Sequence, residues 1–100
     1  MTDQTIPSEG VLMRRTRSLA REEITSWQQR LSSGEWTLAR TLDYLAMRRD
    51  MYERHETVER EGSPCWAPSQ EWADFNHSMA LLYGDAIARI SDHTPVVTKP

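Results

Sequence analysis

The sequence contains very little cysteine, lysine or glycine, and each shortage excludes a class of protein. Cys65 is the only cysteine in 100 residues, which rules out an internal disulfide and fits a reducing compartment. Lys99 is the only lysine, and the net charge is −3, so the chain lacks the basic excess of proteins that bind polyanions. Four glycines are too few for a phosphate-binding loop.

Long apolar runs and a secretion signal are also missing. The longest apolar run is far shorter than the ~20 residues that a helix needs to span a bilayer. The first ten residues, MTDQTIPSEG, have neither a basic start nor an apolar stretch. We therefore expect a soluble, cytoplasmic protein with no membrane attachment. One hundred residues, 38% of them hydrophobic and 27% charged, predict a single domain, residues 1–100, with a marginal core.

The residue types that carry catalysis or bind metals do not form a recognisable pattern. Asp74 and His77 are three residues apart and would supply at most half of a zinc site, which needs three or four ligands. No histidine is placed by the sequence to lower the pKa of the Cys65 thiol. HExxH, EF-hand and Ser/His/Asp patterns are absent from the sequence. We therefore predict no catalytic residue, no metal site and no cofactor, and a protein that is not an enzyme.

The longest periodic stretch is WTLARTLDYLAMRRDMYERHETVERE, residues 36–61, with Gly34 before it and Gly62 after it. It predicts one helix about 39 Å long, at 1.5 Å per residue. Two apolar rows run along this helix, and a small chain needs only one of them for its own core. The first row contains Leu38, Leu42, Leu45 and Tyr52, and the second contains Tyr44, Met47, Met51, His55 and Val58.

Two further helices are predicted on either side. Residues 19–32 follow Ser18, whose hydroxyl is a suitable N-cap. Residues 70–91 follow Ser69, a second suitable N-cap. Apolar residues at spacings of three and four identify the inward face of each helix. In residues 19–32 this face is Ala20, Ile24, Trp27 and Leu31. In residues 70–91 it is Trp72, Phe75, Met79, Leu82, Ala86 and Ile90.

These patterns predict an all-α fold. Short connections between long helices favour antiparallel neighbours. We therefore expect a long antiparallel hairpin of residues 36–61 and 70–91, with the shorter helix 19–32 packed across it. Residues 1–17 and 92–100 are expected to be flexible tails, because they lack apolar periodicity and contain prolines.

Small residues recur every four positions on a neighbouring face of the last helix. Gly84 costs that helix about 0.5–1 kcal/mol relative to alanine, which suggests that a second helix packs closely there. Because a domain of this size buries little surface alone, we expect a homodimer. The residues predicted for dimer packing are Ala80, Gly84 and Ala88.

The second row of residues 36–61 predicts a surface for another protein. Aromatic residues, methionine and arginine are enriched in protein interfaces, and lysine is depleted. Arg48 and Arg49 flank the row. The alternative is that both rows are covered by the other two helices. The predicted protein-binding residues are Tyr44, Met47, Arg48, Met51, Tyr52 and His55.

The sequence has one basic cluster, Arg14, Arg15, Arg17 and Arg21, with no acid between Val11 and Arg21. It is either an arm that contacts phosphate or an acidic protein surface, or a solvated segment neutralised by nearby glutamates. The turn around Gly34 resembles a helix-turn-helix. The acids of the following helix and its length argue against DNA binding, which stays an alternative function.

A small, acidic, all-helical chain with a long helix pair resembles the bacterial antiactivators that bind LuxR-type quorum-sensing regulators, such as the TraM-like and QslA proteins. The stretches that carry this likeness of size and architecture are residues 38–58 and 72–90. The resemblance implies a dimer that binds a transcription regulator and blocks its dimerisation or its DNA binding. Phage-encoded inhibitors of host defence complexes have the same general features and are the rival interpretation.

Overall fold

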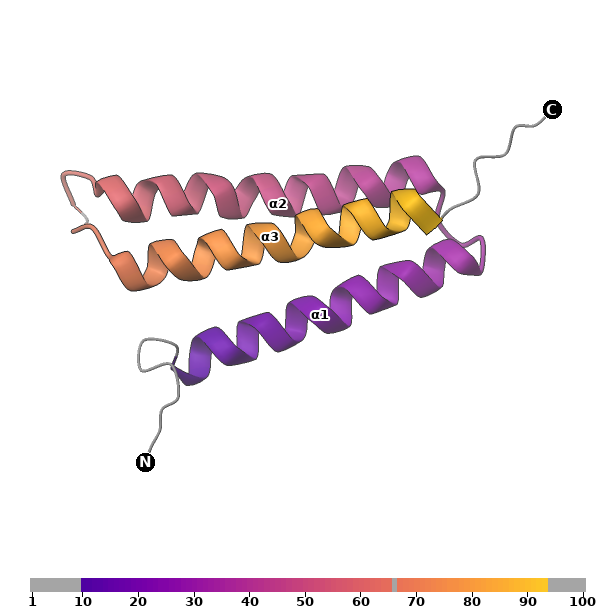
Figure 1. The fold of residues 1–100 in the computed structure, drawn as a ribbon, viewed down its shortest axis with the longest axis horizontal. Helices are drawn as coiled ribbons and strands as arrows, with labels where there is room; N and C mark the ends of the chain where they lie inside the picture. Colours follow the sequence, from indigo (N-terminus) through magenta and orange to yellow (C-terminus); the bar gives the residue numbers. More distant parts are fainter. Residues whose placement is uncertain (1–9, 66, 94–100) are drawn as a thin grey trace.

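The computed structural model describes residues 10–65 and 67–93, and these residues form three helices. They are α1 (Val11–Ser32), α2 (Leu38–Glu61) and α3 (Gln70–His93). Helices α2 and α3 lie side by side as an antiparallel hairpin, and α1 runs obliquely across it (Figure 1). The predicted all-α fold and its helix order are confirmed. No helix within the described ranges is both long enough and apolar enough to cross a membrane.

Helix α1 begins at Val11, eight residues before the predicted start. Ser18 lies inside this helix, so its prediction as an N-cap is wrong. Gly10 occupies that position in an extended conformation and makes no side-chain capping bond. The physical reason for the longer helix is Met13, which is 6% exposed and extends the inward face of Ala20 and Ile24 by two turns.

Arginine also holds the first half of α1 in place. The Nη1 atom of Arg17 donates a hydrogen bond to Ser78 Oγ at 3.0 Å, and its guanidinium lies 5.5 Å from the centre of the Phe75 ring. Both partners are on α3. The prediction that residues 11–17 belong to a tail is therefore wrong, as it is for residues 92 and 93, which continue α3. Residues 1–9 and 94–100 lie outside the described ranges.

The other helix ends largely follow the sequence signals. Gly34 and Gly62 have φ angles of 82° and 76°, in the region that a Cβ disfavours, and each follows the end of a helix as predicted. Ser69 Oγ accepts a hydrogen bond from the Trp72 amide at 3.2 Å, which confirms the predicted cap of α3. Helix α2 begins two residues later than predicted because Thr37 is its N-cap, accepting from the Arg40 amide at 3.1 Å.

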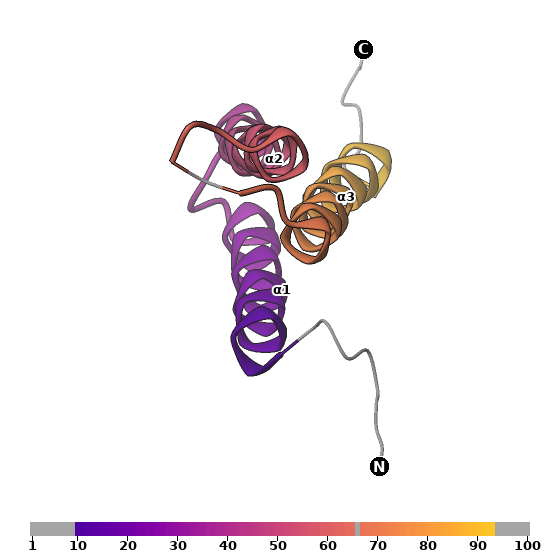
Figure 2. The same cartoon turned by 90° about the vertical axis from the view of Figure 1, so that its left-hand side faces the viewer.

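The core lies where the three helices meet. Helix α1 contacts α2 near its own C-terminus and α3 near its N-terminus, so it crosses from one to the other (Figures 1 and 2). The inward faces predicted from the spacing of apolar residues are buried or half-buried, apart from Trp72, which is 36% exposed. The most deeply buried large side chains are Thr41, Leu45, Met79 and Tyr83.

Two methionines, one buried and one exposed, offer a matched test of this packing. Met79 is fully buried, and Met47 is 54% exposed. We expect Met79→Ala to lower the free energy of unfolding by about 2–5 kcal/mol, because it leaves a cavity in the core. Met47→Ala should change it by less than about 0.5 kcal/mol. Urea unfolding followed by circular dichroism measures both, and equal effects would contradict this assignment of the core.

Candidate protein-binding surface

Glu23 of α1 connects all three helices. Its Oε1 atom accepts a hydrogen bond at 2.7 Å from the hydroxyl of Tyr83 on α3. Its Oε2 atom accepts a hydrogen bond from the hydroxyl of Tyr44 on α2. Arg48 Nε, also on α2, lies 3.7 Å from Oε1. Since hydrogen bonds to a charged acceptor are stronger than neutral ones, this carboxylate fixes α1 against the hairpin.

Arg48 lies between Glu23 and two stacked tyrosines. Its guanidinium carbon is 5.7 Å from the Tyr52 ring centre and 5.8 Å from that of Tyr83, and these two rings stack 5.9 Å apart. Its Nη1 atom donates to the sulfur of Met51 at 3.7 Å. Arg48 Nε is buried and has no hydrogen-bond partner in the described structure. The cation is therefore held by ring faces and by the charge of Glu23.

The three tyrosines of this cluster keep their protons. Burial raises the pKa of Tyr83 well above 10, and its hydrogen bond to Glu23 raises it further. Burial and the hydrogen bond to Glu23 likewise raise the pKa of Tyr44. Burial raises the pKa of Tyr52. The Tyr44 and Tyr83 hydroxyls are thus donors to the carboxylate at neutral pH.

The cluster changes the interpretation of the second apolar row. Internal packing does require part of that row, because Tyr44 and Met51 pack against the core. Tyr52 is only 6% exposed, and Arg48 is half-buried, so neither is displayed on the surface as predicted. The row's remaining members are exposed: Met47 (54%), Val58 (47%) and His55.

A second aromatic group closes the connection between α1 and α2. The rings of Trp27 and Trp36 meet edge to face with their centres 4.1 Å apart, and Trp27 also lies 4.8 Å from Tyr44. The guanidinium of Arg40 lies 3.8 Å from the centre of the Trp36 ring. These contacts fix the C-terminal end of α1 on α2, whereas its N-terminal half lies on α3.

A groove opens between α1 and α2 beyond this contact. Leu19 is 55% exposed on the α1 side, and Leu12, two turns before it on the same face, is 64% exposed. Sequence analysis missed this surface because residues 11–17 were assigned to a tail. The cavity measures about 230 Å³ and is lined by Thr16, Leu19, Ala20, Glu23, Arg48 and Tyr52; it is called the α1–α2 groove below.

The small-residue face of α3 borders a different groove. Ala80 is buried within the chain, Gly84 is half-buried and Ala88 is exposed. A Cβ at Gly84 would lie 3.8 Å from Arg49 Cδ, an ordinary contact, so packing within the chain does not require glycine there. This α2–α3 groove measures about 780 Å³ and is lined by Arg49, Glu53, Glu56, Thr57, His77, Ala80, Leu81, Gly84 and Asp85.

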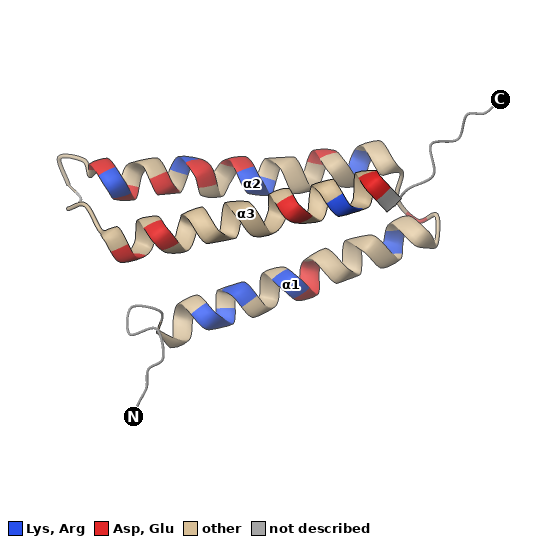
Figure 3. Cartoon of the chain, in the orientation of Figure 1, with Lys and Arg blue, Asp and Glu red and all other residues tan. Residues whose placement is uncertain are grey.

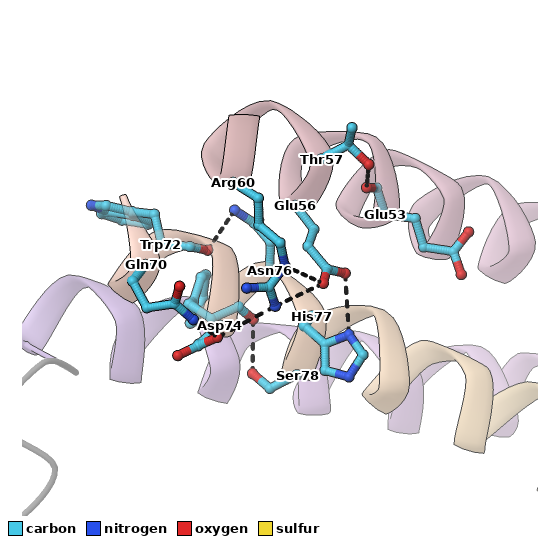
Figure 4. A network of polar contacts seen from close by, with 11 residues as sticks. Glu53, Glu56, Thr57, Arg60, Gln70, Trp72, Asp74, Asn76, His77 and Ser78 are labelled. Carbon is cyan, nitrogen blue, oxygen red and sulfur yellow. Dashed lines mark hydrogen bonds and ion pairs between the residues drawn. The ribbon is translucent and has the colours of Figure 1, made fainter. Parts of the chain in front are cut away.

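A polar network joins α2 to α3 near their connection (Figure 4). Glu56 accepts from Arg60 Nε at 3.0 Å and lies 3.1 Å from His77 Nδ1, and Asp74 Oδ1 accepts from Gln70 at 2.7 Å. Burial raises the pKa of Glu56, but its hydrogen bonds to Arg60 and His77 outweigh burial, and the net pKa is lowered. The network therefore stabilises the fold above the carboxyl pKa of the unfolded chain, and this stabilisation is lost as the pH falls.

The residues considered for chemistry are dispersed in the structure. Asp74 and His77 have different partners, Gln70 and Glu56, and do not point to a common centre (Figure 4). Cys65 is exposed and has a free thiol. Within the described residues, no three His, Cys, Asp or Glu side chains are grouped so that they would hold a metal ion.

The Glu23 cluster predicts a pH dependence of stability. Tyr83→Phe removes a donor from a half-buried carboxylate, so we expect a loss of about 1–3 kcal/mol at neutral pH. Because the pKa of Tyr83 is raised on folding, its contribution is fully present below about pH 10, the pKa of an unfolded tyrosine, and is lost as the pH rises further.

Urea unfolding between neutral and alkaline pH measures both effects. Tyr83→Phe should decline less steeply above about pH 10 than the natural chain. Tyr44→Phe is the variant for comparison. It removes the other donor to Glu23 from a less buried position, so it should lower the free energy of unfolding less than Tyr83→Phe does. A Tyr83→Phe protein with unchanged stability and an unchanged alkaline slope would show that the Glu23 cluster does not hold the helices together.

Comparison with protein-family models, with curated proteins and with solved structures found no match to this chain.

Proposed function

We propose that this protein is a small, non-enzymatic, protein-binding regulator. The observation that carries the proposal is the exposure of large apolar side chains on helices whose inner faces are already well packed. Leu12, Leu19, Met47 and Val58 are 64%, 55%, 54% and 47% exposed. Exposed apolar side chains with arginines beside them are typical of surfaces that bind other proteins.

The partner binds the outer flank of α2. Met47 and Val58 are its exposed apolar contacts, and His55 lies between them along the helix. Met51 and Arg48 contribute from a half-buried position. Tyr44 and Tyr52 support this flank from behind through the contacts that they make with Glu23, Trp27 and Tyr83.

A cytoplasmic transcription regulator of the LuxR type is the partner that we propose, and the chain inhibits it by blocking its dimerisation or DNA binding. The support for this choice is the resemblance in size and in the long helical hairpin.

A second function, binding of nucleic acid, is favoured by the exposed Arg14, Arg15 and Arg21 on α1. It would be recognised by an affinity that falls steeply with salt.

Capture of a partner on the immobilised chain from the native cytoplasm, with and without nuclease, tests this function. We expect to capture a protein that is still retained after nuclease treatment. Its affinity for the chain should fall more than about tenfold with Met47→Asp or Val58→Asp, because each substitution places a charge in an apolar contact. The captured protein should then lose DNA binding or dimerisation when the chain is added.

Thr25→Asp is the matched control, since Thr25 is exposed on α1, away from the outer flank of α2 and outside the α2–α3 groove. It should bind the partner as well as the natural chain does. Loss of capture after nuclease treatment would identify nucleic acid as the ligand. Equal loss of affinity with Thr25→Asp and Met47→Asp would place the contact elsewhere.

Self-association is part of the same proposal. A second copy packs on the α2–α3 groove against Gly84 and Ala88, where the small side chains let a helix approach closely. Gly84→Leu should keep the fold, because a helix gains up to about 1 kcal/mol when glycine is replaced. It should abolish the dimer, whereas Gly84→Ala should preserve it. Light scattering measures the mass of the natural chain and of both variants. A natural chain that is monomeric at roughly tens of micromolar would rule out the proposed dimer.

A further inference from the structure

We propose that the outer face of α1 binds the phosphate backbone of duplex nucleic acid, through three arginines that surround Ser18: Arg14, Arg15 and Arg21. These three residues are called the α1 arginine cluster below. The inference rests on nucleic-acid binding, the second function proposed for this chain, and it identifies both the contact surface and the part of the nucleic acid that is recognised. It does not depend on the partner surface of α2.

Helical spacing brings the α1 arginine cluster together. Arg14 and Arg15 lie four and three residues before Ser18, and Arg21 lies three residues after it, so all three arginines are neighbours of that serine on the helix surface. All four residues are exposed, whereas Ala20 is buried on the opposite side of the helix. The cluster extends about 10 Å along α1, which corresponds to about three nucleotides of one strand.

The positive charge of this cluster is largely uncompensated. Among the described residues, neither Arg15 nor Arg21 forms an ion pair with a carboxylate. Glu23 is engaged instead by the tyrosines and the arginine of the hairpin. Glu22, four residues after Ser18, is the one acid beside the cluster, which therefore keeps a net charge of +2. Neutralisation by nearby glutamates, the alternative for this segment, is thus not observed for these two arginines.

The surroundings of the cluster suit phosphate better than a protein. Gln28 and Ser32 lie seven and eleven residues after Arg21, so uncharged polar side chains continue the outer face of α1. Hydroxyl and amide groups contact phosphate oxygens together with arginine. The exposed Leu19 lies on a different flank, where it lines the α1–α2 groove. The outer face thus lacks the apolar centre that protein interfaces have.

The separation of charge in the chain directs this face toward a polyanion. Helix α1 contains five arginines and two glutamates, whereas α2 and α3 together contain six arginines and ten acids (Figure 3). The net charge of −3 therefore comes from the hairpin, and α1 is a basic side of an acidic protein. A polyanion attracts that side and repels the other, so the field of the protein orients α1 toward the phosphates.

Fluorescence anisotropy with a labelled duplex tests the proposal on the full chain. The probe is a fluorescein-labelled DNA duplex of ~20 base pairs, and a second duplex of unrelated sequence tests whether binding depends on sequence. The test variants are Arg15→Gln and Arg21→Gln. Arg54→Gln is the matched control, since Arg54 is exposed on α2 and its loss changes the net charge by the same amount.

We expect the two duplexes to bind equally, because phosphate contacts carry no sequence information. The affinity should fall about 80-fold between ~20 and ~100 mM salt, as expected for three phosphate contacts. Arg15→Gln and Arg21→Gln should each weaken binding about tenfold or more at ~20 mM salt. Circular dichroism should be unchanged because both side chains are exposed. Arg54→Gln should change the affinity by less than about threefold.

No binding at ~20 mM salt, binding of only one duplex, or equal losses with Arg21→Gln and Arg54→Gln would overturn the proposal. Tighter binding to phosphatidylserine vesicles than to the duplex would assign the cluster to a membrane surface and overturn it as well. If duplex binding fails while capture of the partner still depends on Met47 and Val58, the nucleic-acid site is wrong and the proposed protein-binding function stands.

Discussion

The hydrogen bonds from Tyr44 and Tyr83 to Glu23 join α1 to both helices of the hairpin. The crossing depends on this carboxylate, because it bonds to α2 and α3 at once. Met13, Ala20 and Ile24 add buried apolar contacts along α1, and Trp27 and Arg17 contact the hairpin near the two ends of α1. Neutral tyrosines donate to a charged acceptor, and the half-buried Arg48 balances the charge. The result is a fixed crossing of α1 over α2 and α3, with its outer face held in a defined position.

This crossing also explains why the same helices carry a core and an exposed apolar surface. Helix α1 leaves α2 beyond Tyr44, so the C-terminal half of α2 loses its neighbour on that flank, and His55 and Val58 become exposed. On the opposite side, α3 covers α2 along its length and takes up Leu45 and Tyr52. One flank of α2 thus packs in the core, and the other is exposed to solvent. The proposed regulator binds its partner through the exposed flank, which α1 does not cover.

Much of the fold was predictable from local patterns. The ends of the helices depend on residues close by in the sequence, such as the glycines with positive φ and the Ser69 cap, so they can be recognised locally. The buried face of α3 follows from the helical spacing of residues such as Phe75 and Met79. The Glu23 cluster was not predictable, because it joins residues 21 and 60 positions apart and places polar groups where an apolar core was expected. For the same reason Tyr44 and Tyr52 were assigned to the surface, and the arginine-rich start of α1 was assigned to a tail.

The central claim is that the outer flank of α2 contacts a protein partner while the Glu23 cluster holds α1 against the hairpin. Amide hydrogen exchange of the full chain, with and without the captured partner, tests this claim most directly. The account predicts slower exchange on binding in residues 47–58 and no change around Leu81. Protection confined to α3, or no protection in residues 47–58, would contradict it.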